Sequence, residues 1–495
     1  MKSFKLFILF ISTITLSYQC NNLGTDPLQS QSVTATTPSC FNCHGENTLA
    51  GNKLQWAQAG WSESVHANGI QAPIFASFFT TVNNWYIAGY EWHGSDAFYS
   101  NGSGCQICHT KEGFLKKING DYGTVNWTSS SAFSVAINAD SIKNPTKLTC
   151  FTCHAPHERG DFTLTVDPTT PVTTQSGMVY NKAKGSLCAN CHQVRLSGYS
   201  SVNALVIGNV SAGITKSSLT RFGPHHGPQT DINLGTGGAE YGTKYSATGY
   251  TNHAHSIDTN ANCVNCHMAD DFANLSEPAR YALSPAVGGH SMAVVGIVHG
   301  NPTANIAGCT YTGCHDGGAF GSVAAATFTT GTQYLAKGKA YVNKTGGSTT
   351  AAVYYAKING LLKLLANPDT SCSGLLATAY DNLIPITTET ITWTLMPDGS
   401  YADTTKINFN SCAPTAFSAN IAADASVTNN TTLLASPAGR VAMAIWNFQL
   451  VREDKSMGLH NPTYILELLY DTCMDLKNYT GGAQDCTIGV TYTRP

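Results

Sequence analysis

The pattern of apolar and polar positions predicts few long regular elements in the first two thirds of the chain. Residues 40–315 are broken by short stretches rich in Gly, Ser, Thr and Asn, which is the composition of loops. Residues 56–66 combine aromatic and polar positions at a helical period and predict a short amphipathic helix.

The C-terminal third has more regular patterns. A helix is predicted over about residues 439–452. A second is predicted from Pro462, because Asn461 is a good N-cap and proline suits the first helical position. Residues 357–365 also have a helical pattern, whereas residues 384–395 alternate and favour β-branched side chains, as strands do.

The N-terminus has the pattern of a secretory signal peptide. Lys2 and Lys5 precede an apolar run over residues 6–16, which is shorter than the ~20 residues of a membrane span. An uncleaved anchor is the alternative. Cys20 lies where a lipoprotein carries its modified cysteine, but residues 17–19 match the usual signal poorly, so lipidation stays open. We expect an exported protein, extracellular or at the outer cell surface.

The chain is rich in cysteine and histidine. The chain has 17 cysteines and 16 histidines in 495 residues, whereas only 12% of its residues are charged, against a usual ~25%. An odd number of cysteines cannot all form intramolecular disulfides. The net charge of −3 lacks the basic footprint of nucleic-acid binding, so no nucleic-acid partner is expected.

Five Cys-x-x-Cys-His motifs account for most of the cysteines. From the Cys and His frequencies, about 0.02 such motifs are expected by chance. The pattern is typical of c-type haem attachment: two thiols reach the haem vinyl groups and the next histidine becomes the proximal iron ligand. The attaching residues are Cys40, Cys43, Cys105, Cys108, Cys150, Cys153, Cys188, Cys191, Cys263 and Cys266, and the proximal histidines are His44, His109, His154, His192 and His267.

A sixth motif is a variant in which four residues separate Cys309 from Cys314, before His315. Gly313 can absorb the longer loop through a backbone angle that other residues avoid. We therefore expect six covalently attached c-type haems, five on Cys-x-x-Cys-His and one on Cys-x4-Cys-His. A Cys309–Cys314 disulfide or a decayed site is the alternative here. Zinc or iron–sulfur clusters would leave the repeated histidine unexplained.

Four cysteines follow the last motif, and they allow three disulfide pairings. The simplest joins Cys372 to Cys412 and Cys473 to Cys486, with free buried thiols as the alternative. Export from the reducing cytosol favours disulfides.

Ten histidines remain after the six proximal ones, enough to give every iron a second axial ligand. Imidazole pairs leave no open position for a substrate, so such haems carry electrons, and no catalytic residue is expected. The favoured distal candidates are His66, His93, His157, His225, His226, His255 and His290. His460, at the corner before the last helix, is a candidate ligand or a structural residue, and His253 and His299 are less favoured.

These features predict mainly irregular coil with short α-helices organised around six covalent haems, plus a small β-containing, disulfide-bearing C-terminal region and a helix pair. We expect haem to form much of the core, as metals do in small scaffolds, and the apo-protein to be largely unfolded. The expected divisions are a signal peptide over 1–19, a linker over 20–39, a multihaem electron-transfer domain over 40–315, a Thr- and Asn-rich, β-containing domain over 316–437, and the helix pair and tail over 438–495.

The chain resembles secreted multihaem c-type cytochromes, and more narrowly the extracellular cytochromes whose subunits polymerise into haem-wire filaments. The motifs that carry the resemblance are residues 61–66, 150–157, 223–229, 263–268 with Gly289 and His290, and 454–462. The resemblance implies extracellular electron transfer. The implied partners are other copies of the chain, upstream periplasmic or outer-membrane cytochromes and extracellular electron acceptors. It also implies that a neighbouring subunit supplies one distal histidine.

Two other functions stay open. Multihaem oxidoreductases of the nitrite or hydroxylamine type share the flanking motifs and would need one open haem position, although no Cys-x-x-Cys-Lys site occurs here. A soluble periplasmic electron carrier would have every distal ligand in its own chain.

Overall fold

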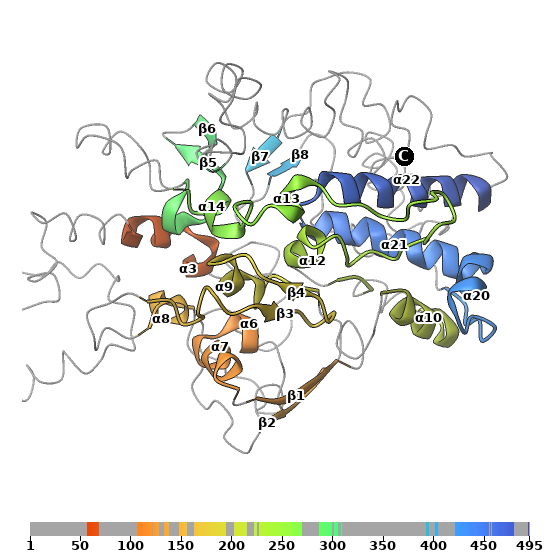
Figure 1. Ribbon diagram of the computed structural model, residues 1–495, viewed down its shortest axis with the longest axis horizontal. Helices are drawn as coiled ribbons and strands as arrows, with labels where there is room; N and C mark the ends of the chain where they lie inside the picture. Colours follow the sequence, from red (N-terminus) through yellow and green to blue (C-terminus); the bar gives the residue numbers. More distant parts are fainter. Residues whose placement is uncertain are drawn as a thin grey trace, which may run out of the picture.

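The structure, a computed structural model, consists of short helices, four hairpins and one pair of long helices. It describes residues 57–68, 106–120, 122–127, 133–137, 148–155, 163–194, 202–214, 222–224, 227–269, 287–298, 301–304, 308, 393–395, 401–403, 421–454, 456, 458–479 and 494. Figure 1 shows the two long helices side by side, with the short helices that carry the haem motifs lying to one side of them.

The long helices are α21 (Pro437–Asp454) and α22 (Pro462–Tyr479). The other helices are α3 (Val65–Asn68), α6 (Gln106–His109), α7 (Lys111–Ile118), α8 (Cys150–Cys153), α9 (Gly185–Ala189), α10 (Val202–Ala212), α12 (Gln229–Asn233), α13 (Ala254–Ile257), α14 (Cys263–His267), α20 (Asn430–Ala435) and the 3-10 turn η4 (Gly289–Ser291). The predicted C-terminal helix pair is thus present, and α21 extends two residues beyond the predicted range at each end.

Side-chain caps explain several helix boundaries. Asn461 caps α22, since its Oδ1 accepts from the backbone N–H of Tyr464 at 3.4 Å. The hydroxyl of Ser436 accepts from Gly439 N at 3.2 Å at the start of α21. The predicted helix over 56–66 is interrupted at Ser64, whose hydroxyl accepts from Ala67 N at 3.1 Å and begins α3.

Among the described residues, the strands form four separate two-stranded antiparallel hairpins. They are β1 (Tyr122–Trp127) with β2 (Phe133–Ile137), β3 (Val172–Thr173) with β4 (Val179–Tyr180), β5 (Val295–Val298) with β6 (Asn301–Ala304), and β7 (Trp393–Leu395) with β8 (Tyr401–Asp403). Only residues 393–395 of the predicted strand over 384–395 are described, and the predicted helix over 357–365 lies outside the described residues.

The largest apolar core lies between the long helices, α10 and the segment from Ile232 to Tyr250. Trp446 is fully buried, and its indole N–H donates to Gly237 O at 2.8 Å. Asn447 holds the same segment from α21, because its amide accepts from Ala239 N at 2.7 Å and donates to Ala239 O at 3.0 Å. This cluster packs protein side chains against one another, and the expectation that haem forms much of the core elsewhere stays a prediction.

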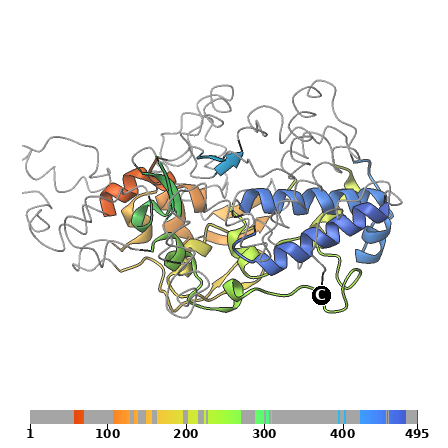
Figure 2. The same ribbon diagram turned by 90° about the horizontal axis from the view of Figure 1, so that it is seen from above.

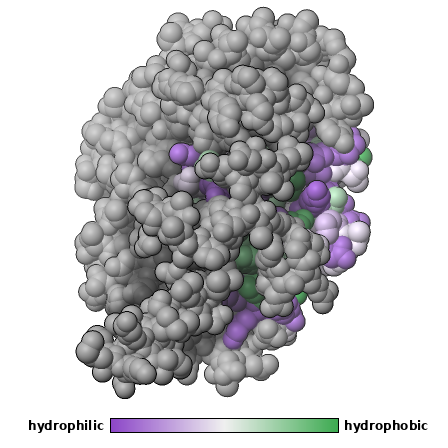
Figure 3. Space-filling model, turned by 90° about the vertical axis from the view of Figure 1, so that its left-hand side faces the viewer, coloured by the Kyte–Doolittle hydropathy of each residue, from purple (hydrophilic) through white to green (hydrophobic). Residues whose placement is uncertain are grey.

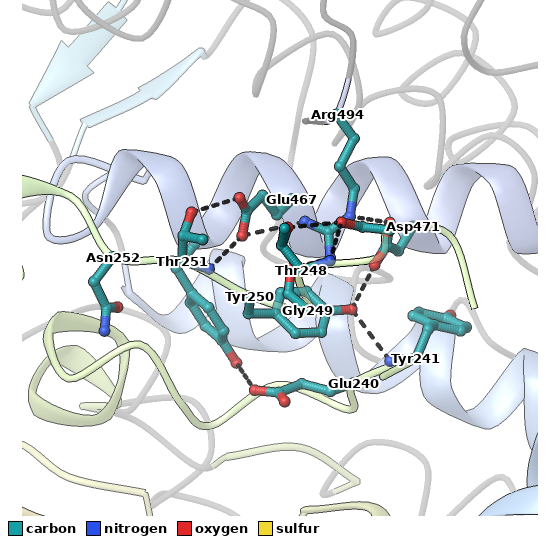
Figure 4. Close-up of polar contacts among 12 residues, drawn as sticks. Glu240, Tyr241, Thr248, Gly249, Tyr250, Thr251, Asn252, Glu467, Asp471 and Arg494 are labelled. Carbon is teal, nitrogen blue, oxygen red and sulfur yellow. Dashed lines mark hydrogen bonds and ion pairs between the residues drawn. The ribbon is translucent and has the colours of Figure 1, made fainter. Parts of the chain in front are cut away.

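A buried cluster of polar and charged side chains holds Arg494 against α22 (Figure 4). Arg494, the penultimate residue, forms ion pairs with Glu467 at 3.2 Å and Asp471 at 2.8 Å, and all three side chains are at most 1% exposed. The hydroxyl of Tyr250 donates to Asp471 at 2.7 Å, and the guanidinium lies 4.6 Å from the Tyr250 ring centroid. This cluster holds residues 248–252 and Arg494 against the same helix, α22.

The described surface is mainly polar. In the view of Figure 3, hydrophilic residues occupy most of the visible described surface and hydrophobic ones show deeper between them. In the part of the chain that the structure describes, no helix is both long and apolar enough to span a membrane.

Candidate haem-binding site

The described Cys-x-x-Cys-His motifs lie on short helices, where two cysteines three positions apart face the same side. In the third motif, His154 N donates to Cys150 O at 2.9 Å, and in the fourth, His192 N donates to Cys188 O at 3.0 Å. Asn262 caps the helix of the fifth motif by accepting from Asn265 N at 2.9 Å. The local sequence therefore places each histidine one turn after the first cysteine.

The fourth motif lies between the second and the fifth. Cys191 Sγ lies 3.9 Å from Ile107 O of the second motif, and Cys263 Sγ lies 4.0 Å from Gly185 O at the start of α9. The Tyr180 hydroxyl lies 3.3 Å from Cys263 Sγ. Cysteines of three motifs that are far apart in the sequence thus lie close to α9. Figure 2 shows the short helices of this part of the chain beside the two long helices.

The sixth motif adjoins the fifth. A Cβ atom added to Gly308, the residue before Cys309, would lie 2.3 Å from Asn265 O and 2.7 Å from Cys266 Cα. Only glycine fits this approach, because real Cβ contacts are never so short. The chain therefore enters its last haem motif in direct contact with α14.

Three of the proximal histidines each face a second histidine ring. The pairs are His192 with His66 (ring centroids 5.9 Å apart, planes at 69°), His154 with His290 (6.1 Å, 34°) and His267 with His460 (6.2 Å, 25°). The partners come from three separate elements: α3, η4 and the corner between α21 and α22.

These distances fit one metal ion between each pair. An imidazole nitrogen binds a metal at about 2.0–2.1 Å and the ring centroid lies about 1.1 Å further, so two opposed ligands have centroids about 6.3 Å apart. All three measured separations lie within a few tenths of an ångström of this value. The donor set of two imidazoles, with a thiol pair beside one of them, is that of a c-type haem with two axial histidines.

Hydrogen bonds hold the Nδ1 atoms of several of these rings. The Nδ1 of His192 lies 3.1 Å from Gln229 Oε1, and that of His267 lies 2.9 Å from the Met292 carbonyl oxygen. The Nδ1 of His460 lies 2.6 Å from a carboxylate oxygen of Asp454. A partner at Nδ1 fixes the ring orientation and leaves Nε2 for the metal.

Burial lowers the pKa of three of these imidazoles and so favours the neutral form, which is the form that binds a metal. Burial lowers the pKa of His66 to about 4, and the charges of His192 and His267 add to the effect. Burial likewise lowers the pKa of His267 to about 4 and that of His192 below its ordinary value. Burial also lowers the pKa of His460, but the charge and hydrogen bond of Asp454 outweigh it, so that this pKa is raised.

The remaining candidates are placed only in part. His255 contacts His253, with ring centroids 4.7 Å apart, and its Nδ1 lies 2.8 Å from Leu459 O. Cys473 is disulfide-bonded. Of His109 only the backbone is described. Outside the described residues lie Cys20, Cys40, Cys43, Cys105, Cys309, Cys314, Cys372, Cys412 and Cys486, and His44, His93, His157, His225, His226, His299 and His315.

Sequence reasoning missed the residues that orient the ligands. Asp454 and Gln229 lie within the motifs that carry the resemblance, but nothing in the sequence assigned them a role. Their contacts depend on α12 meeting the C-terminal end of α21, where the Gln229 amide donates to Glu453 O at 3.4 Å and to Asp454 O at 3.3 Å.

The motifs and the paired histidines fit the haem ligands of a multihaem c-type cytochrome. Residues 17–202, less than half of the chain, match the sequence model of a family described as outer membrane cytochrome MtrC/MtrF-like, domains II/IV. This range includes the first four haem motifs and His66. The match confirms the predicted resemblance to multihaem cytochromes. No curated protein and no solved structure matches the chain.

Proposed function

We propose that this chain is an exported hexahaem c-type cytochrome that carries electrons at the outer cell surface in extracellular electron transfer. The observation that carries the proposal is the set of three opposed histidine pairs at 5.9, 6.1 and 6.2 Å. The match to outer membrane cytochromes supports the cellular setting. Haem, when bound, supplies a one-electron iron couple.

The paired imidazoles favour an electron carrier over an enzyme. Two strong nitrogen ligands on opposite sides leave no site where a small substrate could bind the metal. The pairs His192–His66 and His154–His290 each bring together residues about a hundred or more positions apart, so the folded chain must hold both ligands rigidly. A rigid pair of ligands suits a haem iron that changes its oxidation state without gaining or losing a ligand.

Contacts between motifs indicate an order for the carriers. Cys191 lies beside Ile107 of the second motif, Cys263 lies beside Gly185 of α9, and Gly308 lies against α14, so the second, fourth, fifth and sixth motifs are neighbours in that order. We propose that electrons pass along this order. Closely spaced carriers suit tunnelling between neighbours.

The test is spectroscopic, on the secreted holoprotein. A pyridine haemochrome assay should give six haems per chain, and the oxidised protein should be entirely low-spin. Near-parallel ligand planes give a rhombic low-spin electron paramagnetic resonance (EPR) signal and near-perpendicular planes a signal of large maximum g. We therefore expect a large-g signal from His66–His192 and rhombic signals from the other two pairs. A high-spin haem that binds nitrite or cyanide would instead favour an oxidoreductase.

We further propose that copies of the chain assemble into a filament, supported by the motifs shared with filament cytochromes. Electron microscopy of the secreted protein should show fibres in which one distal histidine comes from a neighbouring subunit. Monomers with every distal ligand in cis would leave a soluble carrier, passing electrons from upstream cytochromes to extracellular acceptors. Mass spectrometry of the mature N-terminus would show whether Cys20 is lipidated.

A further inference from the structure

Asp454 is a buried carboxylate held against one of the haem ligands. It is the last residue of α21, is 2% exposed, and places Oδ1 2.6 Å from Nδ1 of His460. The Ser456 hydroxyl donates to its other oxygen, Oδ2. Both oxygens therefore have partners, and the carboxylate is held in one orientation toward the imidazole.

The other two oriented ligands have neutral partners. Nδ1 of His192 faces an amide oxygen of Gln229, and Nδ1 of His267 faces a backbone carbonyl of Met292. A carboxylate draws the shared proton more strongly than a neutral oxygen does. The imidazole of His460 therefore carries more negative charge than those of His192 and His267, and it would give more electron density to the metal it binds.

We propose that Asp454 is a positioning residue that lowers the reduction potential of the haem held by His267 and His460 below that of the haem held by His66 and His192. This inference rests on the proposed function, because it requires that these pairs bind haem. Negative charge on an axial ligand and a buried anion nearby both stabilise the oxidised iron, which has the higher positive charge.

The two sites are joined through the end of α21. Gln229 contacts His192 through its oxygen and donates to the carbonyls of Glu453 and Asp454 through its nitrogen. The same helix end thus orients ligands of two neighbouring haems but presents a carboxylate to only one of them. A difference in potential between neighbours would favour one direction of electron flow.

The test compares Asp454→Asn with Ser456→Ala in the holoprotein. Asparagine keeps the shape and can still accept from Nδ1–H but has no charge, so the potential of the His267–His460 haem should rise. Ser456→Ala removes a donor to the carboxylate, which then pulls more strongly on the imidazole proton, so the same potential should fall. Potentials are measured by a redox titration followed by EPR.

A matched control is Asp424→Asn. Like Asp454, Asp424 accepts from a serine hydroxyl, in this case from both Ser426 and Ser436, but it lies on another segment and no histidine contacts it in the described residues, so all haem potentials should stay unchanged. Unmoved potentials in Asp454→Asn with low-spin haem retained would overturn the proposal. If that variant becomes high-spin, an unmoved potential in Ser456→Ala overturns it. A wild-type protein without a low-spin haem on His267 and His460 would instead contradict the proposed function.

Discussion

Replacing Arg494 with methionine is expected to destabilise the holoprotein by about 3–5 kcal/mol, the usual effect of removing one partner from a buried ion pair. The magnitude follows from burial: Arg494, Glu467 and Asp471 have side chains at most 1% exposed, so neither carboxylate can turn to water. Methionine keeps most of the volume over the Tyr250 ring, and the loss is therefore mainly electrostatic.

The size of the effect should depend on pH. Burial raises the pKa of Asp471 to about 6, above its ordinary value near 3.8, even with Arg494 beside it. A raised folded-state pKa means that protonation stabilises the fold, fully below the ordinary pKa and less as pH rises through 6. Without Arg494 this pKa rises further, so the variant should be closer to wild type at pH 5 than at pH 8.

The assay is urea denaturation of the holoprotein followed by far-ultraviolet circular dichroism at both pH values. A triple variant with Arg494→Met, Glu467→Gln and Asp471→Asn should recover much of the lost stability, because it leaves no uncompensated charge. A loss below about 1 kcal/mol at pH 8, or one that is the same at both pH values, would refute the buried-ion-pair reasoning.

Three further outcomes are expected. Trp446→Ala should cost about 3–5 kcal/mol, measured by the same denaturation, because it empties a fully buried site beside Phe222 and Gly237; an effect near zero would mean that α21 does not pack on these segments in this way. Gly308→Val should lower haem occupancy of the last motif in mass spectra, because the added side chain collides with α14. His290→Ala should turn one haem high-spin in the EPR spectrum, through loss of the ligand opposite His154, while an unchanged spectrum would remove His290 from the ligand set.

The C-terminal helix pair could be predicted, and the proximal histidines could be proposed, because their signals are local. A Cys-x-x-Cys-His motif contains its own haem attachment, and Asn461 followed by Pro462 marks a helix start within a few residues. Helix α10 was missed because its apolar residues surround the whole helix and leave no periodic stripe to recognise. Its place beside α21 follows from tertiary packing.

The pairing of ligands could not be predicted, because it depends on contacts between distant segments. His66 and His192 are 126 positions apart, and His267 and His460 are 193 apart, so spacing in sequence carries no information about which faces which. His460 could equally well have been a structural residue until the structure placed it opposite His267. The role proposed for Asp454 likewise depends on a contact that the sequence does not show, between its carboxylate and Nδ1 of His460.

The central claim is that each of three proximal histidines shares an iron with the histidine it faces. A cryo-electron microscopy structure of the haem-loaded protein tests it most directly. It should show iron between His192 and His66, between His154 and His290, and between His267 and His460. A different residue, or an open position, opposite any of the three proximal histidines would contradict the account.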